Sequence, residues 1–475
     1  MGEKGGYHHS SQKPTPTIFS RTAAWGGVIS PATIGSTWSV EARGALTTDP
    51  RAEYQLMPSV LCVSGPFASI LFCISCILQT REPPSPPFKG MGIQDLTKLV
   101  EDADIYTTPV ATLAGSTLAW DISCLLHVAI SSREGADQYH AFPPVPVSAV
   151  CESIDQVVGL FKAFNINLIA VFDGVQHPQK GRVSEKREVA ARTKLEKLRS
   201  LWRRGDPEDF GEVQRLKKGC CRVRADIIYM AVERLRKLGI PCVGAPFEAE
   251  WQCAQLQVEG KVQGILSKDS DVLALGATNL VQKYTRRRLD GRTQLYCSLL
   301  RREDVLRKLG DKVGGELTPH GFLALCTFLG NDYILRVRNN GVPACLELTA
   351  DFMATHEGGQ YEFFKRFEVD DSGRKRKWNE SGGDVEDYQR YFNMSVNLFK
   401  YAPIFKKGPD DSLSICPLNA LPDGAAWEGL IGFDPISLFA SCGCTLHEAF
   451  TMEEACRYGK SALKPLPYPE CAPID

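Results

Sequence analysis

The sequence lacks a strong net charge, because its 475 residues include 55 lysines and arginines against 56 aspartates and glutamates. Such a chain has no global attraction for nucleic acid, so any site for a polyanion must be local. Its 17 cysteines are scattered and include no two closely spaced Cys-x-x-Cys pairs, which argues against a disulfide framework and gives no zinc site. This pattern indicates a reducing intracellular compartment, and an apolar content of 43% indicates a globular chain.

Long hydrophobic runs are also scarce, and only residues 59–78 reach the length of a bilayer span. This stretch contains Gly65, Pro66 and four serines, and its nearest flanking positive charges are Arg51 and Arg81. These features disfavour a membrane span, and the stretch begins too far along the chain for an ordinary signal peptide. We therefore favour a stretch that does not span a membrane.

The composition and the hydrophobic pattern of the chain change near residue 90. Residues 1–90 are rich in Gly, Ser, Thr and Pro and end in a proline-rich breaker, which predicts a poorly ordered N-terminal extension. Beyond it, short apolar runs alternate with helical patterns such as the one at 225–238. This alternation predicts an α/β fold with a mostly parallel sheet flanked by helices. The apolar runs cover residues 117–120, 166–172, 240–243, 262–266 and 280–284.

Acidic residues follow the predicted strands. In parallel sheets, ligands bind beyond the carboxyl ends of the strands, so these carboxylates should meet at one edge. Each one alone could be a helix N-cap or a turn residue, but a cluster would repel itself without cations among its members. Hard divalent ions take oxygen ligands, so the cluster suits two Mg²⁺ ions that act on a phosphodiester. The acids are Asp121, Asp173, Glu248, Glu250, Asp269 and Asp271, with Asp332 later in the chain.

Positive charge is concentrated between Lys180 and Arg224, where lysines and arginines outnumber the acids. Taken alone, such a run is explained equally well by a solvated helical face. Lys180 and Arg187 are more informative, because seven residues are about two helical turns and both side chains would project from one face. That face starts just after Asp173, so it can overhang the acidic edge and hold a scissile phosphate.

Six segments carry a family resemblance. From residue 91 to about residue 345, the chain resembles the structure-specific 5′ nucleases, the group that contains flap endonuclease, exonuclease 1 and the xeroderma pigmentosum group G nuclease. The matching segments follow the order of the family's motifs: MGIQDLTKLVEDA, LAWDISCLLH, VFDG, APFEAEWQCA, SKDSDVLALG and LGNDY. Within the group the chain is most similar to exonuclease 1, through MGIQ, through LLH and through a PLNALPD stretch at 417–423.

The resemblance implies a PIN-like sheet, a basic helical arch over the site and a helix–turn–helix and hairpin region that binds DNA. It implies two Mg²⁺ ions, with Mn²⁺ as a substitute, held by Asp121, Asp173, Glu248, Glu250, Asp269, Asp271 and Asp332. Lys180 and Arg187 would stabilise charge on the phosphate as catalytic residues. The implied DNA contacts are Gly92, His127, Arg192, Lys217, Lys218 and Gly341. For His127, an ordinary helix histidine is the alternative.

The chain departs from the family pattern at two places. Ser123 stands where exonuclease 1 has an aromatic residue, so one stacking contact is lost. The hairpin expected to grip duplex DNA with a bound K⁺ ion keeps only its second glycine, Gly341, and Pro343 removes an amide donor. Asparagine tolerates a positive φ better than most residues, so the turn can persist with Asn339 and Asn340 before Gly341. We expect a weaker grip on duplex DNA.

These features predict six regions. They are an extension at 1–90, nuclease regions at 91–190 and 227–305 separated by an arch at 191–226, a helix-two-turn-helix-like region at 306–346, and a partly irregular C-terminal region at 347–475. For residues 1–90, a gene-model extension, a cleaved targeting sequence and a membrane tether remain alternatives. We expect a chain that starts at Met91 to be fully active.

The function predicted from the sequence is that of a monomeric Mg²⁺-dependent 5′→3′ DNA exonuclease with 5′-flap endonuclease capability in repair or replication. Two alternatives remain, which are a flap endonuclease proper and a non-catalytic DNA-binding relative. The expected partners are DNA with a 5′ end, nick or flap, and repair proteins, with no small-molecule substrate. The basic run at 374–377 could be a nuclear address or a surface loop, and we expect a nuclear protein.

Overall fold

The computed structural model describes most of the chain beyond residue 91. The predicted extension, the apolar stretch 59–78 and the basic run 374–377 lie outside the described residues. Within the described ranges, no helix is both long and apolar enough to cross a bilayer. The described residues are 92–100, 107–141, 145–289, 292–337, 340–355, 363–364, 385–408 and 412–442.

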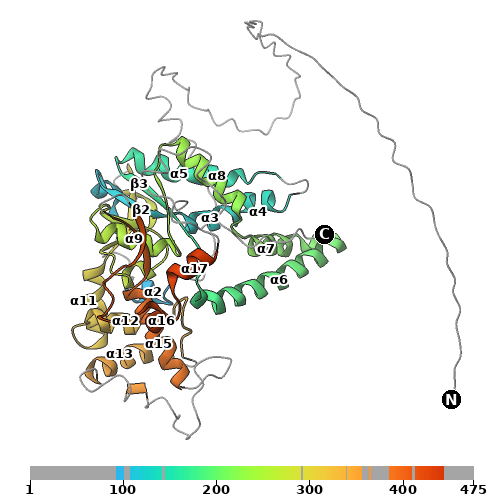
Figure 1. Cartoon of the computed structure of the whole chain (residues 1–475). Coiled ribbons are helices and arrows are strands. Elements are labelled where there is room, and N and C mark those ends of the chain that lie inside the picture. Colours follow the sequence, from blue (N-terminus) through green and yellow to red (C-terminus); the bar gives the residue numbers. More distant parts are fainter. Residues whose placement is uncertain are drawn as a thin grey trace, which may run out of the picture. The chain divides into compact units, whose positions relative to one another are not determined.

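A seven-stranded sheet forms the centre of the fold, with the strand order β1-β7-β6-β5-β2-β3-β4 (Figure 1). The strands from β6 to β4 in this order pair in parallel, and β7 pairs antiparallel with both β6 and β1. The predicted parallel-dominated α/β fold is therefore confirmed, with two antiparallel strands added at one side. The strands are β1 (Thr107–Pro109), β2 (Thr117–Asp121), β3 (Asn167–Phe172), β4 (Cys242–Gly244), β5 (Gly264–Leu266), β6 (Asn279–Leu289) and β7 (Arg292–Arg301).

Both faces of the sheet are covered, which explains why its strands read as continuous apolar runs. Along β2, Leu118 and Trp120 enter the cluster on one face, while Ala119 enters the cluster on the other. The first face packs on α3 (Ile122–Ile130), α5 (Ser148–Ala163) and α8 (Ala225–Lys237), and the second on α9 (Ala249–Val258), α10 (Asp271–Ala274) and α12 (Pro319–Phe328). Each fully buried large apolar side chain contributes about 1.5–3 kcal/mol.

Helix α8 forms at nearly the residues that the spacing of apolar residues predicted. It spans Ala225–Lys237 against the predicted 225–238, and Gly239 follows it with φ +71°. The buried stripe of this helix begins at Ile227, whereas the neighbouring Ile228 is half-buried. Neighbouring apolar residues in a helix point about 100° apart, so only the packing partner decides which of the two faces the core.

Helices α6 (Gly181–Arg204) and α7 (Phe210–Cys220) form a hairpin joined by the short turn η3 (Pro207–Asp209). Figure 1 shows them in green, side by side and extending away from the sheet. Gly205 has φ +65° and ends α6. The hairpin has a small core of its own, built from Leu198, Leu201, Leu216 and Cys220. It crosses the predicted domain boundary at residue 190, because α6 is one continuous helix.

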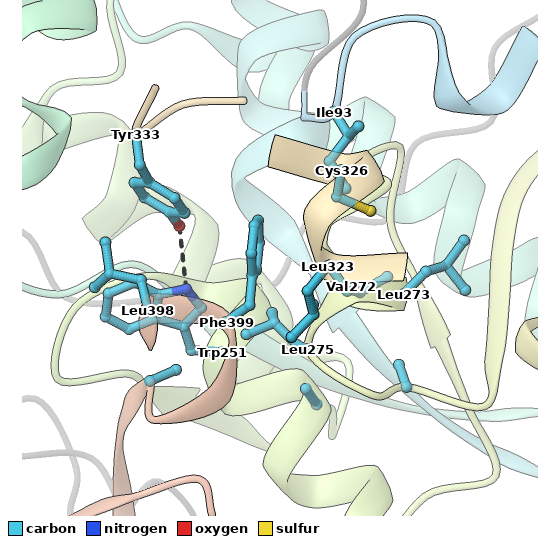
Figure 2. Packing of buried hydrophobic residues seen from close by; sticks show 14 of the residues in the cluster. Ile93, Trp251, Val272, Leu273, Leu275, Leu323, Cys326, Tyr333, Leu398 and Phe399 are labelled. Carbon is cyan, nitrogen blue, oxygen red and sulfur yellow. Dashed lines mark hydrogen bonds between the residues drawn. The ribbon is translucent and has the colours of Figure 1, made fainter. Parts of the chain in front are cut away.

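The C-terminal elements extend the core beneath the second face of the sheet. Figure 2 shows Trp251 of α9 donating a hydrogen bond to the Tyr333 hydroxyl, with Leu398 and Phe399 beside them. These elements therefore belong to the same core as α9, α10 and α12. They are α11 (Arg302–Val313), α13 (Val342–Thr355), α15 (Val385–Lys400), β8 (Pro403–Lys407), β9 (Leu413–Pro417), α16 (Trp427–Ile431) and α17 (Pro435–Ser441).

Candidate metal centre

The predicted acids gather where the parallel strands end. Asp121 is the last residue of β2, and Asp173 directly follows β3. Glu248 stands at the N-cap of α9, with Glu250 in its first turn. Asp269 and Asp271 follow β5, where Asp271 opens α10. Since β5 and β3 lie on either side of β2, the carboxylates flank the point where the strand order reverses.

Two overlapping sets of carboxylates can each hold a cation. In the first set, ligand atoms of Asp173, Glu248 and Glu250 lie within 4.8 Å of one another. In the second set, Glu250, Asp269 and Asp271 satisfy the same limit. Oδ1 of Asp271 is buried with no hydrogen-bond partner among the described residues, as expected of an atom that a metal ion would take. Glu250 belongs to both sets, so the two cation positions would be adjacent.

Neighbouring residues hold Asp121 and Asp173 in place. Oδ2 of Asp173 accepts a hydrogen bond of 2.6 Å from the Ser123 hydroxyl, and its Oδ1 accepts one of 2.8 Å from the Ala249 amide. Oδ2 of Asp121 accepts a bond of 2.7 Å from the Ser267 hydroxyl. Asp121 belongs to neither carboxylate set, and burial together with the nearby Asp173 raises its pKa. Ser123, which interrupts the family pattern, thus orients a carboxylate.

Electrostatics in this cluster favour a bound cation. Burial raises the pKa of Glu248 to about 7, with Asp173 adding to the effect, and burial together with Asp332 raises the pKa of Asp269 to about 7. Burial and the nearby Glu248 raise the pKa of Glu250 well above its usual value, and burial and Asp269 do the same for Asp271. Carboxyls that hold protons near neutrality exchange them for divalent ions when these are available.

Lys180 and Arg187 meet the acids from the base of the helical hairpin. Nζ of Lys180 lies 2.5 Å from Oε2 of Glu248 and 3.3 Å from Oδ2 of Asp332. Nη2 of Arg187 lies 3.0 Å from Oδ1 of Asp332. Burial alone would lower the pKa of Lys180, but Glu248, Glu250 and Asp332 outweigh burial and raise it well above the usual value. Asp332 is thus paired with two cationic side chains and belongs to neither carboxylate set.

Gly92 lies directly against the acids. A Cβ atom at this position would come 2.1 Å from Oδ1 of Asp269 and 2.8 Å from Oδ1 of Asp271, and the residue has φ +84°. Only glycine fits such a place. His127, on α3, is half-buried, and burial lowers its pKa, with Arg222, Arg187 and Lys180 contributing. Its ring is therefore neutral near pH 7.

The other predicted DNA contacts differ in how exposed their side chains are and in whether they form ion pairs with other parts of the protein. Arg192 and Lys218 are exposed on the hairpin, and Arg192 pairs with Glu188 within α6. Lys217, in contrast, lies 2.8 Å from Oδ1 of Asp137 on α4 (Arg133–Tyr139), with a side chain only 13% exposed. It therefore anchors α7 to the body of the protein.

The predicted K⁺-binding turn is only partly described, because 338–339 lie outside the described residues. Gly341 is exposed, and its carbonyl accepts a hydrogen bond from the Cys345 amide at the start of α13. The K⁺ site and the duplex grip of this turn stay predictions.

Sequence reasoning missed one residue of the site, His177, which is fully buried beside Glu248. Burial and the nearby Lys180 lower its pKa well below the usual value, so it is neutral. No motif pointed to it, because the rings around it, Trp251, Tyr333 and Phe433, come from three distant parts of the chain.

Two known protein domains match the two stretches of the chain that contain the predicted acids. The XPG N-terminal domain matches residues 91–194, and the XPG I-region matches residues 239–332. Flap endonuclease 1 of Drosophila grimshawi is 30% identical over 268 residues, which are 55% of this chain and 65% of that protein. Exonuclease 1 of Danio rerio is 26% identical over 342 residues, which are 70% of this chain and 38% of that protein. The chain thus spans less than two thirds of either relative.

Among solved structures, the catalytic core of Rad2 in complex with DNA substrate is 18% identical, with a TM-score of 0.41. That similarity covers 73% of this chain and 97% of the Rad2 chain. The two matched domain ranges contain all seven predicted acids, whereas the end of α6 and the whole of α7 lie between these ranges.

Proposed function

We propose that this chain, which matches the XPG N-terminal domain and the XPG I-region, is a Mg²⁺-dependent 5′→3′ DNA exonuclease that also cleaves 5′ flaps. The observation that carries the proposal is the pair of carboxylate sets that share Glu250, with Lys180 beside them. A buried acidic cluster would repel a DNA phosphate unless cations and a basic side chain compensated for its charge.

Each group has a role that follows from its position. Asp173, Glu248 and Glu250 would hold one ion, and Glu250, Asp269 and Asp271 would hold the other. Bound there, divalent ions supply an activated water and neutralise charge on the leaving oxygen of the phosphodiester. The chain itself contributes hydrogen bonds that fix the ligands, such as the one from Ser123 to Asp173.

Lys180 and Arg187 supply the positive charge that the phosphate needs. Their partners Glu248 and Asp332 hold both side chains at the acidic edge, so neither must search for its position when DNA arrives. Charge that grows on the phosphate oxygens is then stabilised by groups already in place. The products would carry a 5′-phosphate and leave a 3′-hydroxyl.

The helical hairpin favours a second candidate, a flap endonuclease proper. Its basic helices α6 and α7 stand at the site, and α6 begins directly after Lys180. A single-stranded 5′ end that passed beside them would be guided by exposed positive charge. DNA as the substrate, action in repair or replication and a nuclear location are parts of the same proposal. A tagged copy of the protein in cells would test its location.

One assay separates the candidates. The protein is incubated with blunt, nicked and 5′-flap duplexes that carry a 5′ label, in Mg²⁺, in Mn²⁺ and in EDTA. We expect labelled mononucleotides, together with a product cut at the flap junction, in either metal and nothing in EDTA. A junction product alone would favour the flap endonuclease. Binding of DNA without any cleavage would favour a non-catalytic DNA-binding relative and overturn the proposal.

A further inference from the structure

The loop that carries Lys180 is fixed at its beginning by the neighbouring strand end. The Gly174 amide donates to the Phe247 carbonyl at 2.5 Å, and the Val175 amide donates to the Pro246 carbonyl at 3.0 Å. A Cβ at Gly174 would come 2.2 Å from the Ala245 carbonyl oxygen, so this contact leaves no room. Beyond Val175 the loop leaves that strand end, and other contacts must decide where Lys180 lies.

Those contacts come from the C-terminal segment, here residues 427–441, which comprises α16, the turn at Gly432 and Phe433, and α17. Nε2 of Gln179 donates to the Ile431 carbonyl at 3.1 Å, across 252 residues of sequence. Gly432 has φ +80°, and a Cβ there would lie 2.6 Å from the same Nε2. Asn397 of α15 holds α16 from behind, by donating to the Leu430 carbonyl at 3.0 Å.

A second contact joins the same segment to the acids. The ring of His177 stacks on Phe433 with centroids 5.8 Å apart and planes 14° apart. Nε2 of His177 lies 3.5 Å from Oε1 of Glu248, and neither ring nitrogen has a hydrogen-bond partner among the described residues. The rings around His177 therefore fix its place by packing. Phe433 also meets Phe247, the residue before Glu248, edge-on at 5.8 Å.

Resting on the proposed function, we infer that the C-terminal segment positions Lys180 and Glu248 for the reaction through Gln179 and His177. Phe433 contacts His177, which lies three residues before Lys180, and Phe247, which directly precedes Glu248. A shift of this one ring would therefore disturb the contact between Lys180 and Glu248. Phe433 and Gln179 are thus positioning residues that act through the catalytic lysine and a metal ligand. A displacement of about 1 Å in such a group can lower a rate about 100-fold.

The chain offers a matched control for Phe433. Phe439, in the same segment, is buried to a similar extent, but it packs edge-on against Phe405, with centroids 5.5 Å apart. Phe433→Ala and Phe439→Ala should both lower the unfolding temperature, because each removes a buried ring. A second pair avoids the core: Gln179→Ala removes the bond to Ile431, while Gln176→Ala changes an exposed amide in the same loop.

The first measurement is amide hydrogen exchange of residues 174–180 without metal or DNA, which does not depend on activity. We expect exchange there to be at least about fivefold faster in Phe433→Ala and Gln179→Ala and unchanged in Phe439→Ala and Gln176→Ala. Equal exchange in all four variants and the wild type would overturn the inference. Since Gln179 is only half-buried, its pair remains informative if Phe433→Ala does not fold.

The second measurement is the single-turnover rate on a 5′-flap duplex in saturating Mg²⁺, with DNA affinity measured in Ca²⁺. We expect Phe433→Ala and Gln179→Ala to lose about tenfold or more in rate with affinity within about twofold, and both controls to keep their rate. Equal losses in Phe433→Ala and Phe439→Ala would mean that the segment supports only folding. If the wild type cleaves nothing, the proposed function fails. The hydrogen-exchange measurement still tests whether the C-terminal segment holds the loop that carries Lys180.

Discussion

The acidic edge and the helical hairpin meet at Lys180 and Arg187, yet they are built in opposite ways. At the edge, side chains from several elements are buried, paired and hydrogen-bonded, so that Lys180 and Glu248 have little freedom. The hairpin instead has four buried residues of its own and exposes most of its charged side chains. A site for chemistry needs groups fixed in advance, whereas a surface for a polyanion needs charge that solvent and substrate can reach.

The largest effect should come from the ligand that both carboxylate sets share. Glu250→Gln removes one charge from each proposed cation site, so we expect the single-turnover rate to fall at least about 1000-fold, a barrier increase of about 4 kcal/mol. Asp271→Asn and Asp173→Asn each affect one set only, so each should lower the single-turnover rate by at least about 100-fold.

DNA binding in Ca²⁺ should persist or tighten in these variants, since each removes a charge that repels phosphate. Asp121→Asn is the matched control, because Asp121 belongs to neither set, and it should lose less rate than Glu250→Gln. An equal loss at Asp121 would contradict the assignment of the shared ligand.

The next effect concerns the two basic residues at the boundary between the regions. Lys180 is largely buried between Glu248 and Asp332, whereas the Arg187 side chain is 54% exposed and pairs with Asp332. We expect Lys180→Ala to lower the single-turnover rate by about 100-fold and Arg187→Ala by about tenfold, with little change in affinity. Quench-flow rates and equilibrium titration in Ca²⁺ measure the two quantities. Affinity losses as large as the rate losses would indicate ground-state binding instead.

A smaller effect should appear in stability against pH. The pKa values of Glu248 and Asp269 are about 7 when folded, above ordinary values of about 4, so the folded metal-free protein binds more protons than the unfolded chain between about pH 4 and pH 7. The contribution of these two carboxyls to metal-free stability should therefore be most favourable below this window and decline as pH rises through it. Mg²⁺ replaces those protons, so its stabilisation should grow from pH 5 to pH 8 in calorimetry with EDTA or Mg²⁺. Stabilisation by Mg²⁺ that is independent of pH would contradict the proton exchange.

The smallest effects should come from the hairpin. Lys218 is exposed, so Lys218→Ala should weaken DNA binding by about threefold and reduce its salt dependence by about one charge. Lys217 is paired with Asp137, so Lys217→Ala should cost about 1 kcal/mol or less of stability and change the salt dependence less. Titrations at several salt concentrations, compared with thermal unfolding, distinguish the two lysines. A larger change in salt dependence at Lys217 would reverse this interpretation.

Local patterns were sufficient for much of the fold. The strands β2 and β3 and the helix α8 lie within one or two residues of their predicted bounds, because apolar runs and a 3.6-residue periodicity record local burial. The acidic edge could be predicted as well, since parallel strands bring their carboxyl ends together whatever the details of packing. For the same reason, the sequence could place Asp121 and Asp173 near one another without showing which oxygen each neighbour holds.

The sequence by itself therefore determined the α/β class, the acidic edge and the basic run that follows it. Only the tertiary structure decided that Glu250 belongs to both carboxylate sets, that Lys217 faces Asp137 and that Phe433 packs on His177. These facts depend on contacts between residues far apart in the chain, and no periodic pattern encodes such pairs. These contacts form where the last helices pack against the loop that carries Lys180, and they depend on how well the two surfaces fit each other.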